Sequence, residues 1–158
     1  MNPSPSTALA VLRAWLLVGT LDILAAILNY LRVGGREPVR IFWYIASAVF
    51  GRDAAVAGGW LTAGCGLLFH YLIAGCWAAL FFAAYPRRPW LGRHWALGGA
   101  AYGIVVWLVM NLVVVPLSRA PRIPPTLANV LVGAGILVVC VGLPVAFLAH
   151  QHYAKAAG

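Results

Sequence analysis

The segment 8-ALAVLRAWLLVGTLDILAAILNYL-31 is the part of the sequence that decides the fold. It is long enough to cross a bilayer, which takes about 20 apolar residues in a helix. Its only acidic residue is Asp22. A carboxylate at membrane depth costs about 2.5–3.5 kcal/mol on insertion scales. The segment therefore predicts a membrane span whose acidic side chain either has a partner group or serves the function of the protein.

Composition extends this prediction to the whole chain. The 158 residues are 63% hydrophobic and 9% charged, whereas a soluble domain has about 25% charged residues. Three more apolar stretches follow the first. We therefore predict an all-α fold, an integral membrane four-helix bundle that forms one transmembrane domain over residues 1–158. The spans are expected at about 8–31, 58–85, 95–117 and 126–149, followed by a short polar tail.

A shorter apolar segment, residues 41–51 (IFWYIASAVFG), lies between the first two spans. Eleven residues are too few to cross the hydrocarbon core. Trp43 and Tyr44 are side chains typical of the membrane interface. The segment therefore predicts a short helix, either re-entrant or interfacial. In the last span, Pro144 is expected to bend the helix.

The charge is concentrated near the ends of the apolar stretches. The chain has 11 Lys and Arg against 3 Asp and Glu. Basic side chains at these positions reach out to anionic head groups, and no soluble domain is available to present a basic face to nucleic acid. We therefore expect the lipid bilayer as a partner and no nucleic acid.

Four spans place both termini on the same side of the membrane. The basic residues divide almost equally between the two sides, five with the termini and six opposite. The positive-inside rule therefore gives only a small preference. The dense cluster of Arg87, Arg88 and Arg93 favours cytoplasmic termini.

Polar residues near the middle of the spans are the candidates for function. Asp22 and His70 lie at similar depth if the first two spans are antiparallel neighbours, which predicts an Asp22–His70 pair. The pair could be a proton relay, or a hydrogen-bonded pair that only fixes helix register and contributes about 0.6 kcal/mol. Other candidate partners of Asp22 are Tyr30, Tyr71 and Asn111. Asn111 is the second polar residue at depth, so Asp22, His70 and Asn111 form the predicted binding or proton-relay set.

Small residues indicate where helices approach closely. Gly19 shares a helix face with Asp22, and Gly59 and Gly66 share a face with His70. Gly99 and Gly103 form a GxxxG motif, which serves packing within the bundle or between protomers. All five glycines are expected to be helix-packing positions.

Motifs for other chemistry are missing from the sequence. One His and one Asp are too few ligands for a metal ion, and there is no HExxH or CxxC. A haem held by His70 would need a second ligand, and His94 and His150 lie near span ends. Nothing matches a hydrolase elbow or a phosphate-binding loop. We therefore expect no metal, no cofactor and no catalytic residue, and we do not expect an enzyme.

Four segments resemble a known family when they are taken together. They are GTLDI (19–23), IASAVFGRDA (45–54), HYLIA (70–74) and AAYGIVVWLVMNLVVVPLS (100–118). The chain resembles small uncharacterised bacterial inner-membrane proteins with four predicted spans. The resemblance covers nearly the whole chain and implies a bacterial inner-membrane location, but it carries over no activity. It implies a common frame made of Gly19, Asp22, Gly51, Gly59, His70, Tyr102, Asn111 and Pro116.

The sequence therefore indicates a small multi-pass membrane protein with a polar centre inside the membrane. Two more specific functions stay open. One is an oligomeric proton-coupled transporter or permease that uses Asp22 and His70. The other is an accessory subunit of a larger membrane complex. The expected protein partner is accordingly a second copy of the chain or a larger assembly.

Overall fold

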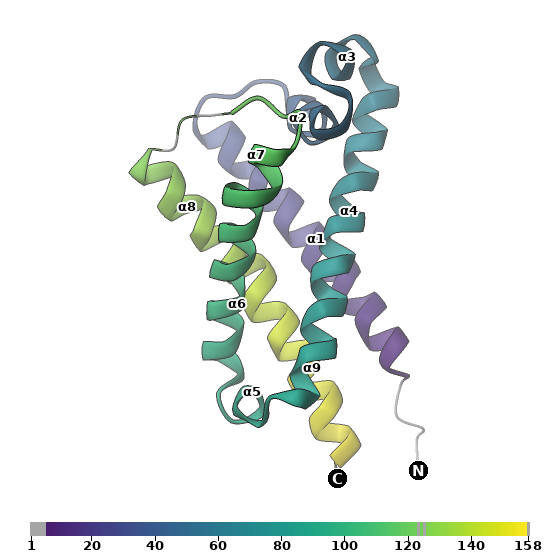
Figure 1. The fold of residues 1–158 in the computed structure, drawn as a ribbon, viewed down its shortest axis with the longest axis vertical. Coiled ribbons are helices and arrows are strands. Elements are labelled where there is room, and N and C mark those ends of the chain that lie inside the picture. Colours follow the sequence, from purple (N-terminus) through teal and green to yellow (C-terminus); the bar gives the residue numbers. More distant parts are fainter. Residues whose placement is uncertain (1–5, 123, 125, 158) are drawn as a thin grey trace.

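The computed structural model describes residues 6–122, 124 and 126–157, and it confirms the predicted all-α four-helix bundle (Figure 1). Within these residues every regular element is a helix. Four helical stretches are long and apolar enough to cross a membrane, namely Thr7–Arg32, Gly59–Arg87, Trp95–Leu117 and Leu127–Lys155. The chain is therefore a small multi-pass membrane protein.

The spans are built from the following elements. The first is α1 (Thr7–Arg32), and the second is α4 (Gly59–Ala84) with a 3-10 turn at Tyr85–Arg87. The third joins α6 (Trp95–Val109), a π-helical segment (Met110–Val114) and α7 (Val115–Leu117). The fourth joins α8 (Leu127–Leu137), a second π-helical segment (Val138–Gly142) and α9 (Leu143–Ala157). Three short helices connect the spans: α2 (Val39–Phe50), α3 (Arg52–Ala57) and α5 (Pro89–Arg93).

The two ends of the bundle carry different connections. Helix α1 begins and α9 ends at the same end, where α5 also lies (Figure 1). We call this the terminal end. Helices α2 and α3 lie at the opposite end, and α2 runs across the bundle rather than along it. The short helix predicted at 41–51 is therefore present, as a cap over one end of the bundle.

Helix α2 is fixed to the start of α4. The indole Nε1 of Trp43 donates to the Gly59 carbonyl oxygen at 2.8 Å. Gly51 separates α2 from α3 with a φ of 81°, in the left-handed region that favours glycine. Gly66 of α4 is packed so tightly against Phe42 that a Cβ atom would clash with the Phe42 carbonyl group.

The core lies toward the terminal end, where α1, α4 and α9 meet. Its aromatic members are Phe81, Phe82 and Tyr85, which are almost completely buried. Small residues such as Ala14 and Ala146 fill the remaining space. Many leucines point outward instead, as suits helices surrounded by lipid, where small residues let helices approach and large apolar ones face the acyl chains.

The last helix is longer than the apolar pattern predicts. Residues 150–157, expected to be a polar tail, continue α9. The Tyr153 hydroxyl donates to the Phe82 carbonyl oxygen at 3.0 Å. His150 shares a hydrogen bond of 2.8 Å with Tyr85, and His152 shares one of 3.1 Å with Thr7. These contacts extend the helix because they bind its polar turns to α1 and α4.

Both π-helical segments end two residues before a proline. Pro116 and Pro144 have no backbone N–H, and a proline ring clashes with the carbonyl group four residues earlier. In each span that carbonyl lies inside the π-helical segment. The backbone bonds there reach back five residues, from Val115 to Met110 and from Leu143 to Val138. Each helix thus accommodates its proline by widening one turn of the backbone.

Four of the five glycines predicted for packing lie at close helix contacts. A Cβ atom on Gly19 would meet the Tyr71 ring, and one on Gly66 would meet Phe42. On Gly99 it would meet Gly142, and on Gly103 it would meet Val138. The GxxxG motif therefore packs within the bundle.

Gly59 has a different role from the packing that we expected. Nothing lies within 4 Å of a Cβ atom placed on it, and its φ is 56°. Its position is instead the turn at which α4 begins after α3. The sequence pattern did not reveal this because Gly59 falls on the same face of the helix as the packing residues.

Candidate functional site

The structure brings Asp22 and His70 together between α1 and α4. Asp22 lies ten residues from the end of α1 at Arg32, and His70 lies eleven residues from the start of α4 at Gly59. At 1.5 Å per residue both side chains lie about 15–17 Å from the end capped by α2. That is about half of a 30 Å hydrocarbon core.

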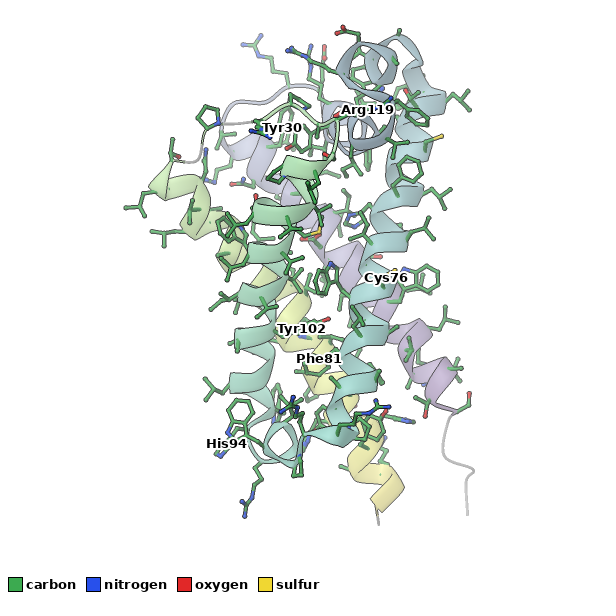
Figure 2. All side chains as sticks on the ribbon, viewed as in Figure 1. Tyr30, Cys76, Phe81, His94, Tyr102 and Arg119 are labelled. Atoms are coloured by element: carbon green, nitrogen blue, oxygen red, sulfur yellow. The ribbon has the colours of Figure 1, made fainter. Side chains whose placement is uncertain are left out.

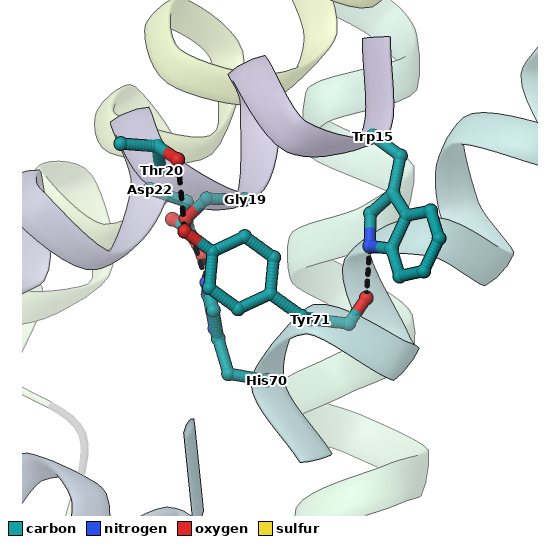
Figure 3. Close-up of polar contacts among 6 residues, drawn as sticks. All are labelled: Trp15, Gly19, Thr20, Asp22, His70 and Tyr71. Atoms are coloured by element: carbon teal, nitrogen blue, oxygen red, sulfur yellow. Dashed lines mark hydrogen bonds and ion pairs between the residues drawn. The ribbon is translucent and has the colours of Figure 1, made fainter. Parts of the chain in front are cut away.

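The two ring nitrogens of His70 have different neighbours (Figure 3). Nε2 lies 2.8 Å from the Gly19 carbonyl oxygen, and Nδ1 lies 4.0 Å from Oδ2 of Asp22. A carbonyl oxygen only accepts, so Nε2 must carry the hydrogen and donate it. Nδ1 is left to face the carboxyl group.

This geometry defines a site for one exchangeable proton. The proton resides either on Asp22, beside a neutral imidazole, or on Nδ1, beside an ionised carboxylate. The 4.0 Å separation is an ion-pair distance and is too long for a direct hydrogen bond. Proton exchange between the two groups therefore needs a closer approach of the side chains or a bridging water.

Next to this pair, Tyr71 connects α1 and α4 through two hydrogen bonds (Figure 3). Its hydroxyl shares a hydrogen bond of 2.8 Å with Thr20, and its carbonyl oxygen accepts from Trp15 Nε1 at 2.5 Å. The Trp15 ring lies against Gly75, where a Cβ atom would come within 3.0 Å of it, closer than ordinary van der Waals contact. The lack of a side chain at Gly75 thus gives the indole access to the Tyr71 carbonyl.

Asp22 and His70 both line a cavity of about 200 Å³. The cavity lies where all four spans and the α2 cap converge. Its other lining side chains are mainly apolar, with Ile45 from α2, Trp77 from α4, and Met110 and Val141 from the two π-helical segments among them. Of the two polar side chains, His70 is 11% exposed and Asp22 is 25% exposed. The pair therefore adjoins a largely apolar cavity.

The third residue of the predicted set is not part of this centre. Asn111 is exposed, and its side chain donates to the Trp107 carbonyl oxygen of its own helix at 2.9 Å. Asn111 therefore lies apart from Asp22 and His70, with which the sequence grouped it, because the Trp107 carbonyl satisfies its amide on its own helix. Tyr30 lies at the end of α1 against Gly35. Tyr71 is adjacent to the pair but bonds to Thr20 rather than Asp22.

Sequence reasoning missed the residues that position the pair. The Gly19 carbonyl, Thr20 and Trp15 were not recognised as partners of the second span. The sequence signal for Trp15 and Gly19 was that they share one helix face with Asp22, whereas Thr20 lies off that face. As for metals, no group of three or more His, Cys, Asp or Glu side chains clusters among the residues that the structure describes.

No known protein family, curated protein or solved structure matches the chain. The fold and the site together define its class: a small multi-pass α-helical membrane protein. Two of its titratable side chains, Asp22 and His70, are partly buried and face each other halfway along the bundle.

Proposed function

We propose that this protein is a proton-coupled transporter or permease in which Asp22 and His70 exchange the proton. One observation carries the proposal: Nδ1 of His70 faces the Asp22 carboxyl group, while Nε2 is occupied by the Gly19 carbonyl. Ionisable side chains inside a membrane are costly and typically mark ion or proton pathways. The adjoining cavity supplies space beside the pair for a small solute.

We further propose that the protein resides in a bacterial inner membrane with cytoplasmic termini. The location rests on the resemblance of its four segments to small inner-membrane proteins, for which no matching family was found. The cluster of Arg87, Arg88 and Arg93 at the terminal end supports the orientation. The expected oligomer or larger complex stays a proposal. It would have to use a surface other than the GxxxG motif, which is occupied within the chain.

The experiment is proton flux in proteoliposomes under an imposed pH gradient. Wild type is compared with Asp22→Asn, which keeps the size of the side chain but cannot ionise. His70→Gln is the second variant, because a glutamine amide still donates to the Gly19 carbonyl but does not titrate. Thr20→Val is the matched control, since it removes a polar contact from the same interface and leaves the pair unchanged.

We expect flux in wild type and Thr20→Val, and flux near the empty-liposome leak in the other two variants. Equal traces for all four proteins would assign the pair a purely structural role in helix register. Retained flux in Asp22→Asn alone would refute the role of the carboxyl group. Melting temperatures of the four proteins in detergent separate a loss of transport from a loss of fold.

A further inference from the structure

A second and larger pocket lies at the capped end of the bundle, remote from the Asp22–His70 pair. Its volume is about 440 Å³, which is within the range of about 300–1,000 Å³ typical of ligand sites. One wall is formed by α2 and α3, and the other by the loop that follows α7. The loop is fixed to α2 because the Arg119 backbone N–H donates to the Ala48 carbonyl oxygen at 3.0 Å (Figure 2).

The charged groups of this pocket are all of one sign. Arg40, Arg52 and Arg122 line it, and no carboxylate is among the described lining residues. Arg40 is partly neutralised, since its Nε donates to the Glu37 carboxylate at 2.7 Å. Arg122 is held by a longer contact of 3.4 Å from Nη2 to the Pro116 carbonyl oxygen. Counting Glu37, the three guanidinium groups leave a net charge of +2 for a ligand to neutralise.

The rest of the pocket is suited to an amphipathic molecule. Trp43, Tyr44 and Val56 provide most of the apolar wall on the α2 and α3 side. Burial raises the pKa of Tyr44, which keeps its phenol neutral and able to donate a hydrogen bond. Close by, Trp60 and Leu61 at the start of α4 are about 80% exposed (81% and 79%) and face outward. Exposed tryptophan is typical of the level of the head groups, so head groups are expected at this end of the bundle.

We propose that this pocket binds a phosphate-bearing anion at the membrane surface. Guanidinium groups match phosphate oxygens in both geometry and charge, and they often bind them through two parallel hydrogen bonds. Anionic lipid head groups present phosphate of this kind at the membrane surface. The same phosphate chemistry could come from a phospholipid or from a soluble phosphate ester, and the experiment distinguishes the two sources.

The test uses the full chain purified in an uncharged detergent, where both ends of the bundle are accessible. The probes are dihexanoyl phosphatidylglycerol, dihexanoyl phosphatidylcholine and glycerol 3-phosphate at constant ionic strength. Binding is measured for wild type and for the double variant Arg52→Gln/Arg122→Gln. The matched control is Arg88→Gln/Arg93→Gln, which removes the same charge from the terminal end. Arg52→Lys/Arg122→Lys keeps the charge but loses the paired geometry.

We expect the Arg52→Gln/Arg122→Gln variant to bind its preferred probe at least about tenfold more weakly, with a change of less than about twofold in the control. The affinity of the lysine variant should lie between the affinities of these two variants. Binding of phosphatidylglycerol without competition from glycerol 3-phosphate assigns a phospholipid as the source. Equal binding of glycerol 3-phosphate assigns a soluble ester. Equal affinities in the two glutamine variants, with unchanged melting temperatures, would overturn the proposal.

Discussion

Gly66 of α4 lies directly against the backbone of Phe42, so a single added methyl group would collide with the Phe42 carbonyl. This contact holds the α2 cap against the bundle, because backbone cannot move aside as a flexible side chain can. Gly66→Ala is therefore expected to lower the free energy of unfolding by about 1–3 kcal/mol, the usual cost of overpacking.

Gly64 provides the control for this prediction on the same helix. Nothing lies within 4 Å of a Cβ atom placed on Gly64. Gly64→Ala should be neutral or should raise stability by up to about 1 kcal/mol, since alanine favours helix more than glycine does. Thermal unfolding of both variants in detergent measures the difference. Equal melting temperatures would contradict the close packing of α2 on α4.

The hydrogen bond from Trp15 to the Tyr71 carbonyl should contribute measurably to stability. Trp15→Phe removes the donor but keeps an aromatic ring, and hydrogen bonds between membrane helices average about 0.6 kcal/mol with a maximum near 1.7. We expect a loss within that range in chemical unfolding. Trp60→Phe, at a tryptophan that is 81% exposed, should change stability little. A larger effect at Trp60 would argue against the contact.

The polar turns of α9 should stabilise the bundle although they lie beyond the apolar part of the span. Deleting residues 150–158 removes the contacts of His150, His152 and Tyr153 with α1 and α4. Deleting residues 154–158 retains all three. We expect a clear drop in melting temperature only for the longer deletion, because each lost hydrogen bond is worth about 1 kcal/mol. Similar melting temperatures for the two truncated chains would show that these contacts do not contribute.

The arrangement of the ends predicts a labelling pattern in membrane vesicles. Cysteines placed at Arg93 and Lys155 should react with an impermeant maleimide from one side, and a cysteine at Asp53 should react from the other side. The bundle requires this opposition, because α5 and the end of α9 lie together and α3 lies at the far end. Reaction of Arg93→Cys and Asp53→Cys from the same side would contradict the four-span topology.

Hydropathy was sufficient to locate the spans, and it was least accurate where a helix leaves the hydrocarbon. The first span was expected at 8–31 and is Thr7–Arg32, and the third matches at both ends. Residues 150–157 were missed because their helix depends on hydrogen bonds to distant residues, which no local pattern encodes. The short helix α5 was also missed, because a stretch with two prolines and a glycine is typical of a loop.

The part of the candidate site that was predictable is the part that depends on how deep a residue lies along its span. Counting residues along two antiparallel helices places Asp22 and His70 at the same level, and the structure has them in contact. The Gly19 carbonyl was not predictable, because every residue has such a group and only the packing selects one. Asn111 shows the converse: a polar residue at depth can be satisfied by its own helix.

The π-helical segment Val138–Gly142 has a consequence for the register of the last span. A π turn is equivalent to one extra residue inserted into an α-helix, and one residue corresponds to a rotation of about 100°. Val141 lines the cavity and also belongs to the same buried core as Val145, Ala146 and Ala149, which follow it. Deleting one residue from this segment would remove the widened turn and rotate the second half of the span away from the core. The widened turn therefore sets which face of the second half of the span meets the core, and the length of this segment is as constrained as its composition.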